Sequence, residues 1–137
     1  MGLYLGVFKD DMEISGLEIG SYGDFGDFRD TVSTTLEGNE PGSKYPILIL
    51  HSDCDGDWPV ESLPMLIAEL ENISEAFRCL LPTEVTAVWK KEVVKKLGLK
   101  INTLYDCFFD IDGEPLLERL IKLARLGLKE QLPIIFQ

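Results

Sequence analysis

The sequence predicts a single compact domain of the α/β or α+β class, with about four strands in a mixed sheet and about four helices. The length of 137 residues suits one domain with one core. Apolar residues make up 45% of the chain and charged residues 27%, which is ordinary globular usage. Short apolar runs alternate with longer stretches in which apolar residues recur at three and four positions. The domain is expected to cover residues 1–137.

Strands are predicted where the apolar runs are short. The first covers residues 3–8 and the second Met12 to Ile19, with a bend or bulge at Ser15 and Gly16. The run from Ile47 to Leu50 has the length of a strand buried on both faces, and residues 133–136 form a last strand. Sites in α/β proteins usually follow the carboxyl end of a buried strand, so the segment after Leu50 is the first candidate.

Helices are predicted where apolar residues follow the spacing of three and four. Their expected ranges are 24–37, 63–81, 83–97 and 115–126. Asp24 and Thr83 are interpreted as N-caps, and Gly127 as the end of the last helix. In the third helix Trp89 is placed on the buried face and Lys90 outside it. Residues 102–111 fit a strand or a short helix equally well.

The charge distribution limits the classes of partner. The formal net charge is −11, and residues 1–82 carry 16 acidic but only 4 basic side chains. This repels nucleic acid and anionic membranes and attracts a basic partner, although acidity can also serve solubility alone. We find no membrane-spanning run and no signal peptide. The three cysteines have no paired spacing, which favours a reducing compartment, and we expect the protein to be cytoplasmic.

The segment His51–Trp58 (HSDCDGDW) concentrates the chemistry of the chain. It holds the one histidine, three aspartates at a spacing of two and one of two tryptophans. Counted from Asp53, the glycine and glutamate of a calcium-binding EF-hand loop are replaced by Trp58 and Pro64, so that interpretation fails. A different metal site, or an acid–base pair of His51 and Asp53, stays open. The structural alternative is that these carboxylates cap turns and the next helix.

Two interpretations of Trp58 are equally open: an exposed anchor for a partner, or a side chain folded back onto the domain. The sequence Asp110–Gly113 has the Asp-x-Asp-Gly shape of haloacid-dehalogenase-like phosphotransferases. Too few residues follow it for that chemistry, and a turn before a helix is the better interpretation. No nucleophile elbow, phosphate loop or dinucleotide fingerprint occurs, so we predict no catalytic residue and no cofactor.

Several motifs resemble those of immunity protein 70 of bacterial polymorphic toxin systems. They are LYLGVF, GSYGDFGDFRD, HSDCDGDW and the ending FDIDGEPLLERL…LPIIFQ, and the similarity covers nearly all of residues 1–137. The resemblance implies an antitoxin that binds and blocks a cognate toxin domain, without enzymatic activity or cofactor.

Our hypothesis for the partner-binding site combines an acidic loop with a neighbouring helix. The loop contributes His51, Asp53, Asp55, Asp57 and Trp58, and the helix contributes Asp24, Asp27 and Asp30. An acidic surface of this kind would fit a toxin with a basic cleft that attacks nucleic acid. The first alternative is a small metal-dependent enzyme or metal-binding module that uses residues 51–57. A homodimeric structural protein is the second.

Overall fold

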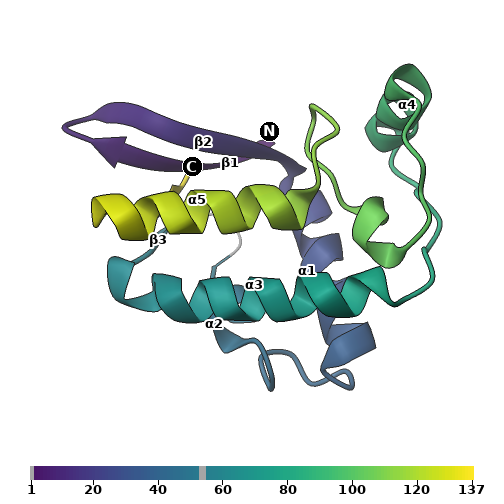
Figure 1. Cartoon of the computed structure of the whole chain (residues 1–137), viewed down its shortest axis with the longest axis horizontal. Helices are drawn as coiled ribbons and strands as arrows, with labels where there is room; N and C mark the ends of the chain where they lie inside the picture. The colour runs from purple at the N-terminus through teal and green to yellow at the C-terminus, as the bar shows by residue number, and fades with distance from the viewer. Residues whose placement is uncertain (1, 53–54) are drawn as a thin grey trace.

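The computed structural model describes residues 2–52 and 55–137 and confirms the fold class. Within these residues an antiparallel sheet of four strands, in the order β2-β1-β4-β3, packs with five α-helices (Figure 1). Every strand pairing among the described residues is antiparallel. The sheet is therefore antiparallel, whereas the sequence predicted a mixed sheet. The strands are β1 (Gly2–Lys9), β2 (Met12–Ser21), β3 (Asp57–Trp58) and β4 (Ile134–Phe136), and the α-helices are α1 (Tyr22–Leu36), α2 (Pro46–Ile49), α3 (Leu63–Arg78), α4 (Val88–Leu97) and α5 (Leu116–Glu130).

The hairpin of β1 and β2 begins the sheet as predicted. Its turn places Asp10 and Asp11 at positive φ, as hairpin turns of two residues require. Leu3, Leu5 and Val7 alternate along β1 on the buried face, which gives the strand its side in the fold. The register shifts twice, between Leu3 and Tyr4 and between Val7 and Phe8 of β1. On β2 the two irregularities fall on either side of the predicted bend at residues 15–16.

The last strand lies inside the sheet. In β4, Phe136 pairs with Leu5 of β1, while Ile134 pairs with Trp58 of β3 on the other side. The backbone N–H of Gln137 donates to the carbonyl of Tyr4 at 2.8 Å, extending the pairing. The predicted final strand is therefore confirmed, and it joins β1 to the end of the acidic loop.

The predicted strand at residues 47–50 is wrong, because these residues form the single-turn helix α2. The N–H groups of Ile49 and Leu50 donate to carbonyls four residues earlier, at 3.0 Å each. The buried carboxylate of Glu69 accepts from the N–H groups of Ile47 and Leu48, at 3.1 and 3.0 Å, which satisfies the start of the turn. Four apolar residues fit a buried helical turn as well as a strand, and this distant carboxylate decides between them.

Helices α3 and α5 lie side by side (Figure 1); α5 packs against β1, β2 and β4, and α1 packs against β1 and β2. Helix α3 follows the predicted range closely. Phe28 of α1 lies at the centre of the core, with its ring 6.3 Å from that of Phe77 in α3 and 5.2 Å from that of Phe108. These edge-on aromatic contacts join three distant parts of the chain into one core.

Three predicted helix ends differ from the structure. Ser21 caps α1, and Asp24 occupies the third helical position of a reciprocal capping box. Helix α4 begins at Val88 rather than after Thr83, with Ala87 in an extended conformation as its N-cap. Helix α5 runs past Gly127 until Gln131 takes the left-handed conformation that ends it.

The ambiguous stretch 102–111 contains a short 3₁₀ helix, Leu104–Cys107, and then an extended segment. In that segment Phe109 forms one isolated bridge with Pro115. Both alternatives left open by the sequence are thus partly present, in succession.

Candidate functional site

Trp58 is a core residue, which excludes its interpretation as an exposed anchor. Its side chain is 1% exposed, and its indole N–H donates to the carbonyl of Ile47 at 3.0 Å. Its ring meets that of Phe136 edge-on, with the centroids 4.8 Å apart. The second alternative, folding back, is the one observed: Trp58 joins β3 to β4 and to α2.

His51 holds the two ends of the acidic loop together. Its ring stacks on Phe136 at 4.1 Å between centroids. Its Nδ1 lies 2.7 Å from the carbonyl oxygen of Ser52, and its Nε2 lies 2.7 Å from that of Asp57. Both ring nitrogens therefore face backbone carbonyls rather than carboxylates. In this arrangement His51 supports the loop through the backbone of Ser52 and Asp57.

Two of the three loop aspartates lie within the described residues. Asp53 lies outside the described residues. Asp55 and Asp57 are exposed, and Asp55 accepts a hydrogen bond from the Ser52 hydroxyl at 2.7 Å. Among residues 2–52 and 55–137, no group of three or more His, Cys, Asp or Glu side chains could hold a metal ion. The described part of the loop thus exposes the carboxylates of Asp55 and Asp57 to solvent.

The three helical aspartates do not form one set. Asp24 is half-buried, and its Oδ2 accepts from the N–H and hydroxyl of Ser21, at 2.8 Å each, and from the indole N–H of Trp89 at 3.0 Å. Asp27 and Asp30 are exposed one turn apart on α1. Arg29, between them in sequence, donates to the carbonyl of His51 at 2.7 Å, so the middle of α1 lies against the start of the acidic loop.

Asp110 confirms the interpretation of its motif as a turn. Its side chain is buried, and its Oδ1 accepts from the N–H groups of Asp112 and Glu114 at 2.9 and 3.0 Å. Its Oδ2 pairs with Arg119 of α5 at 2.9 Å. The carboxylate thus fixes the loop that leads into α5.

Glu69 is a buried acid that the sequence analysis missed. Burial raises the pKa of Glu69, and so does the nearby charge of Glu37, while the two N–H donors of α2 oppose that shift. Its position held a signal: it follows Leu66 by three residues and precedes Ile73 by four, on the apolar stripe of α3. A charged residue on such a stripe needs a partner inside the fold, which α2 provides.

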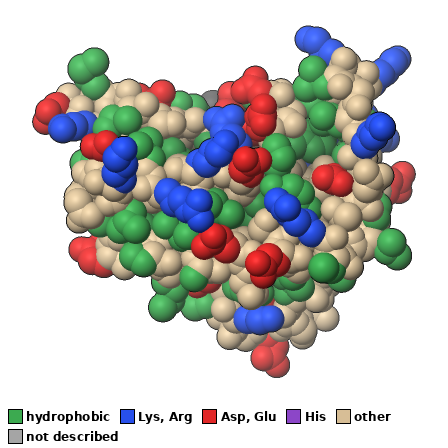
Figure 2. Space-filling model, in the orientation of Figure 1, with side chains coloured by type: hydrophobic (Ala, Val, Ile, Leu, Met, Phe, Trp, Pro, Cys, Tyr) green, Lys and Arg blue, Asp and Glu red, His purple; other side chains and the backbone are tan. Residues whose placement is uncertain are grey.

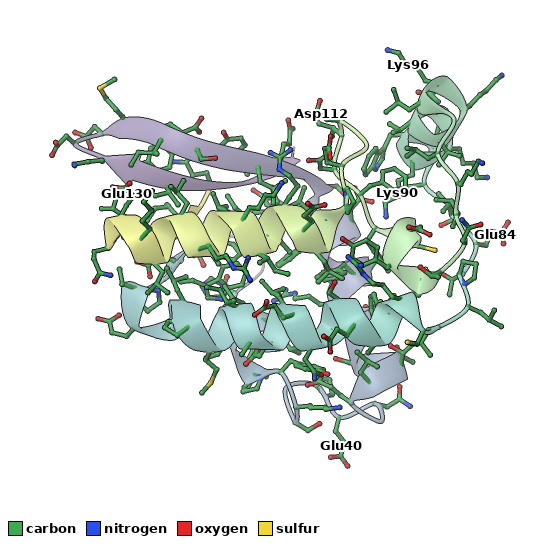
Figure 3. The ribbon with its side chains drawn as sticks, viewed as in Figure 1. Glu40, Glu84, Lys90, Lys96, Asp112 and Glu130 are labelled. Carbon is green, nitrogen blue, oxygen red and sulfur yellow. The ribbon has the colours of Figure 1, made fainter. Side chains whose placement is uncertain are left out.

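Lys90 is the clearest departure from the predicted surface. It was placed outside the apolar face, but it is 7% exposed and its Nζ donates to the carbonyl of Cys107 at 3.3 Å. The ammonium group lies 4.9 Å from the ring centre of Phe108 and 5.6 Å from that of Phe109. Such contacts between a cation and aromatic faces compensate for part of the lost hydration. Figure 3 shows Lys90 pointing from α4 back towards the domain.

Burial lowers the pKa of Lys90, although the charges of Asp24 and Asp27 oppose the shift. The folded protein therefore takes up this proton less readily than the unfolded chain. Its stability should rise as the pH increases through the lowered pKa towards the ordinary lysine value.

Lys90→Met removes the amine and keeps the unbranched chain. We expect the free energy of unfolding of the wild type, minus that of the variant, to increase between pH 7 and pH 10. The full increase, reached once the pH exceeds the ordinary lysine value, should be about 1.4 kcal/mol for each unit by which the pKa is lowered. Urea unfolding of both proteins in reducing buffer at several pH values measures this difference. A difference that stays constant with pH would contradict the buried position of the amine.

A groove separates α4 from the domain, and we call it the α4 groove. Its volume is about 740 Å³. It is lined from α4 by Trp89, Glu92, Val93, Lys96 and Leu97, and from the domain by residues 20, 21, 24, 87, 111 and 112. Trp89 is half-buried here, which corrects its predicted place in the core. Figure 2 shows basic side chains gathered over α4, and both charges interspersed over α3 and α5.

Within the described residues, none of the helices is long and apolar enough to cross a bilayer.

Comparisons with known proteins give one relationship. Neither the curated proteins nor the solved structures contain a match to the chain. A family model described as immunity protein 70 matches residues 3–136. This match covers nearly the whole chain, and the chain therefore belongs to the immunity protein 70 family.

Proposed function

We propose that the protein binds the toxin domain encoded beside it and neutralises that toxin by covering its active surface. The observation that carries the proposal is family membership together with exposed carboxylates on two adjacent elements. Asp27 and Asp30 on α1, and Asp55 and Asp57 in the loop, offer negative charge on neighbouring parts of the fold. A basic cleft, such as a nuclease needs for its substrate, would be attracted to this charge. The protein would act in the cytoplasm without catalysis or cofactor.

The residues of the original hypothesis take different roles in this proposal. Asp27, Asp30, Asp55 and Asp57 would contact the toxin. His51 and Trp58 would instead hold the loop in place, since both pack on Phe136.

The test is charge reversal in two pairs, Asp27→Lys with Asp30→Lys and Asp55→Lys with Asp57→Lys. The control, Glu40→Lys with Glu130→Lys, changes the formal charge equally and lies away from α4 at other edges of the molecule (Figure 3). Affinity for the purified toxin domain and growth rescue on co-expression are measured for each. We expect a reversed interface pair to weaken binding on the order of tenfold or more, chiefly through slower association, while the control binds like the wild type.

Two results would count against the proposal. If the wild-type protein forms no complex with the neighbouring toxin and gives no rescue, the antitoxin function fails. If it binds but both reversed pairs, shown to be folded by circular dichroism, protect as well as the wild type, the acidic surface fails.

A further inference from the structure

We propose that the α4 groove receives a basic side chain of the toxin, an arginine or a lysine with apolar residues beside it. This rests on the proposed function and names a second surface for it. The groove is larger than a single side chain needs, since its volume falls in the range of whole ligand sites, about 300–1,000 Å³.

The apolar part of the groove is exposed although it is built from large side chains. Leu97 of α4 is 51% exposed, and Ile111 on the opposite wall is 46% exposed. Val93 lies one turn before Leu97 on the same helix face, and Trp89 one turn before that. Grouped apolar side chains at a surface hollow are typical of a place where another molecule binds.

The charge of the groove selects a cation. Carboxylates approach it from three elements: Asp24 from α1, Glu92 from α4 and Asp112 from the loop before α5. Lys96 is the one basic side chain among the groove residues that the structure describes. Figure 3 shows Asp112 and Lys96 at the same end of the molecule as Lys90. A guanidinium or ammonium group entering here would meet excess negative charge over an apolar floor.

Trp89 is held in a way that suits such a cation. Its indole N–H is fixed by Asp24 at 3.0 Å, and its ring meets Phe109 edge-on at 5.9 Å between centroids. The ring is therefore oriented before any partner arrives. Tryptophan is the aromatic side chain that attracts cations most strongly, and the Nζ of Lys90 already lies 5.8 Å from the centre of this ring. A fixed ring costs little entropy when a further cation binds.

Two glycines allow the walls to approach. A Cβ at Gly20 would lie 2.7 Å from Oδ2 of Asp24 and 3.2 Å from the Trp89 ring. A Cβ at Gly113 would lie 2.6 Å from a methyl group of Leu97. Both residues also have positive φ, +127° and +81°, which glycine adopts without strain. The spacing between α4 and the domain thus depends on bare backbone on the domain side.

The position of α4 in the fold leaves this face open to a partner. The helix stands apart at one end of the molecule (Figure 1), and hydrogen bonds from Trp89 to Asp24 and from Lys90 to Cys107 attach it there. Asp27, part of the proposed acidic surface, lines a neighbouring cavity of about 220 Å³ together with Asp24 and Lys90. A toxin bound along α1 would therefore reach the groove without a separate interface.

The test compares two charge-reversed double variants of equal formal charge. Glu92→Lys with Asp112→Lys changes two exposed groove residues, and Glu40→Lys with Glu130→Lys is the control. A third variant, Leu97→Arg, places a cation inside the groove. Affinity for the cognate toxin domain is measured by calorimetry, with circular dichroism to establish folding and light scattering to establish oligomeric state. We expect the groove variants to bind on the order of 10- to 100-fold more weakly and the control to bind normally.

Three other outcomes would each overturn the proposal. Groove variants that are folded and bind the toxin like the wild type overturn the groove and leave the antitoxin function standing. A wild-type protein that binds no toxin overturns both. If the wild type is a dimer that the groove variants dissociate while toxin binding persists, the occupant is a second copy of this chain and the proposal is wrong.

Discussion

Replacing Trp58 with alanine should destabilise the protein by about 3–5 kcal/mol, the usual cost of deleting a large aromatic side chain from a core. Trp58 is 1% exposed and makes ring contacts with both Phe136 and His51. The deletion also leaves the carbonyl of Ile47 without its indole donor. Urea unfolding followed by circular dichroism measures the loss.

Trp58→Phe is the matched control, because it keeps an aromatic ring and removes the indole N–H. We expect it to cost about 1–2 kcal/mol, since one hydrogen bond and part of the packing are lost. An alanine variant as stable as the wild type would show that Trp58 is a surface residue. It would also reopen its interpretation as an anchor for the toxin.

Replacing Glu37 with glutamine should cost on the order of 2–3 kcal/mol at neutral pH. The Glu37 side chain is buried at the end of α1 and accepts four hydrogen bonds, which define the turn that follows. The donors are the hydroxyl of Ser33 at 2.8 Å and the backbone N–H groups of Gly42, Lys44 and Tyr45 at 3.1, 2.9 and 2.8 Å. A glutamine has one acceptor oxygen instead of two and brings an amide that faces donors. Its charge is also lost, and bonds to a charged acceptor are the stronger ones.

The pH dependence of this stabilisation has a definite sign. Burial acts to raise the pKa of Glu37, but the N–H groups of Tyr45, Lys44 and Gly42 and the Ser33 hydroxyl together hold it below its usual range. The stabilisation is therefore complete above the ordinary glutamate pKa and is lost as the pH falls through the lowered value. Thermal unfolding from pH 7 to pH 3 should show the wild-type advantage over Glu37→Gln shrinking towards acid. An advantage that grows on acidification would contradict the assignment.

The sequence predicts those elements of the fold whose signal is local. Helix α3 and the hairpin of β1 and β2 are placed well, because their apolar spacing extends over several turns or pairs. The turn at Asp110 is also predicted, since its residues carry the turn chemistry themselves. Helix α2 is missed because its four apolar residues are too few to show a period. The carboxylate that stabilises it belongs to Glu69, far along the chain.

The candidate site is predicted only in part, for a similar reason. Asp27, Asp30, Asp55 and Asp57 are exposed, as partner-binding residues must be, and their role in binding stays a prediction. Burial of polar and aromatic side chains is not predicted, because it depends on what other elements bring to them. Trp58 and Lys90 both lie against rings from distant segments, so neither position could be derived from its neighbours in the chain.

The pairing of β1 with β4 has a consequence for the timing of synthesis. Leu5 is made some 130 residues before Phe136, yet they are partners inside one sheet. Until residues 134–136 leave the ribosome, β3 lacks the strand that joins it to the hairpin. Pairings so distant in sequence are slow to form, because a long loop must close first. A newly made chain would therefore complete its sheet only after this late pairing, and a chain cut before residue 134 would lack the inner strand altogether.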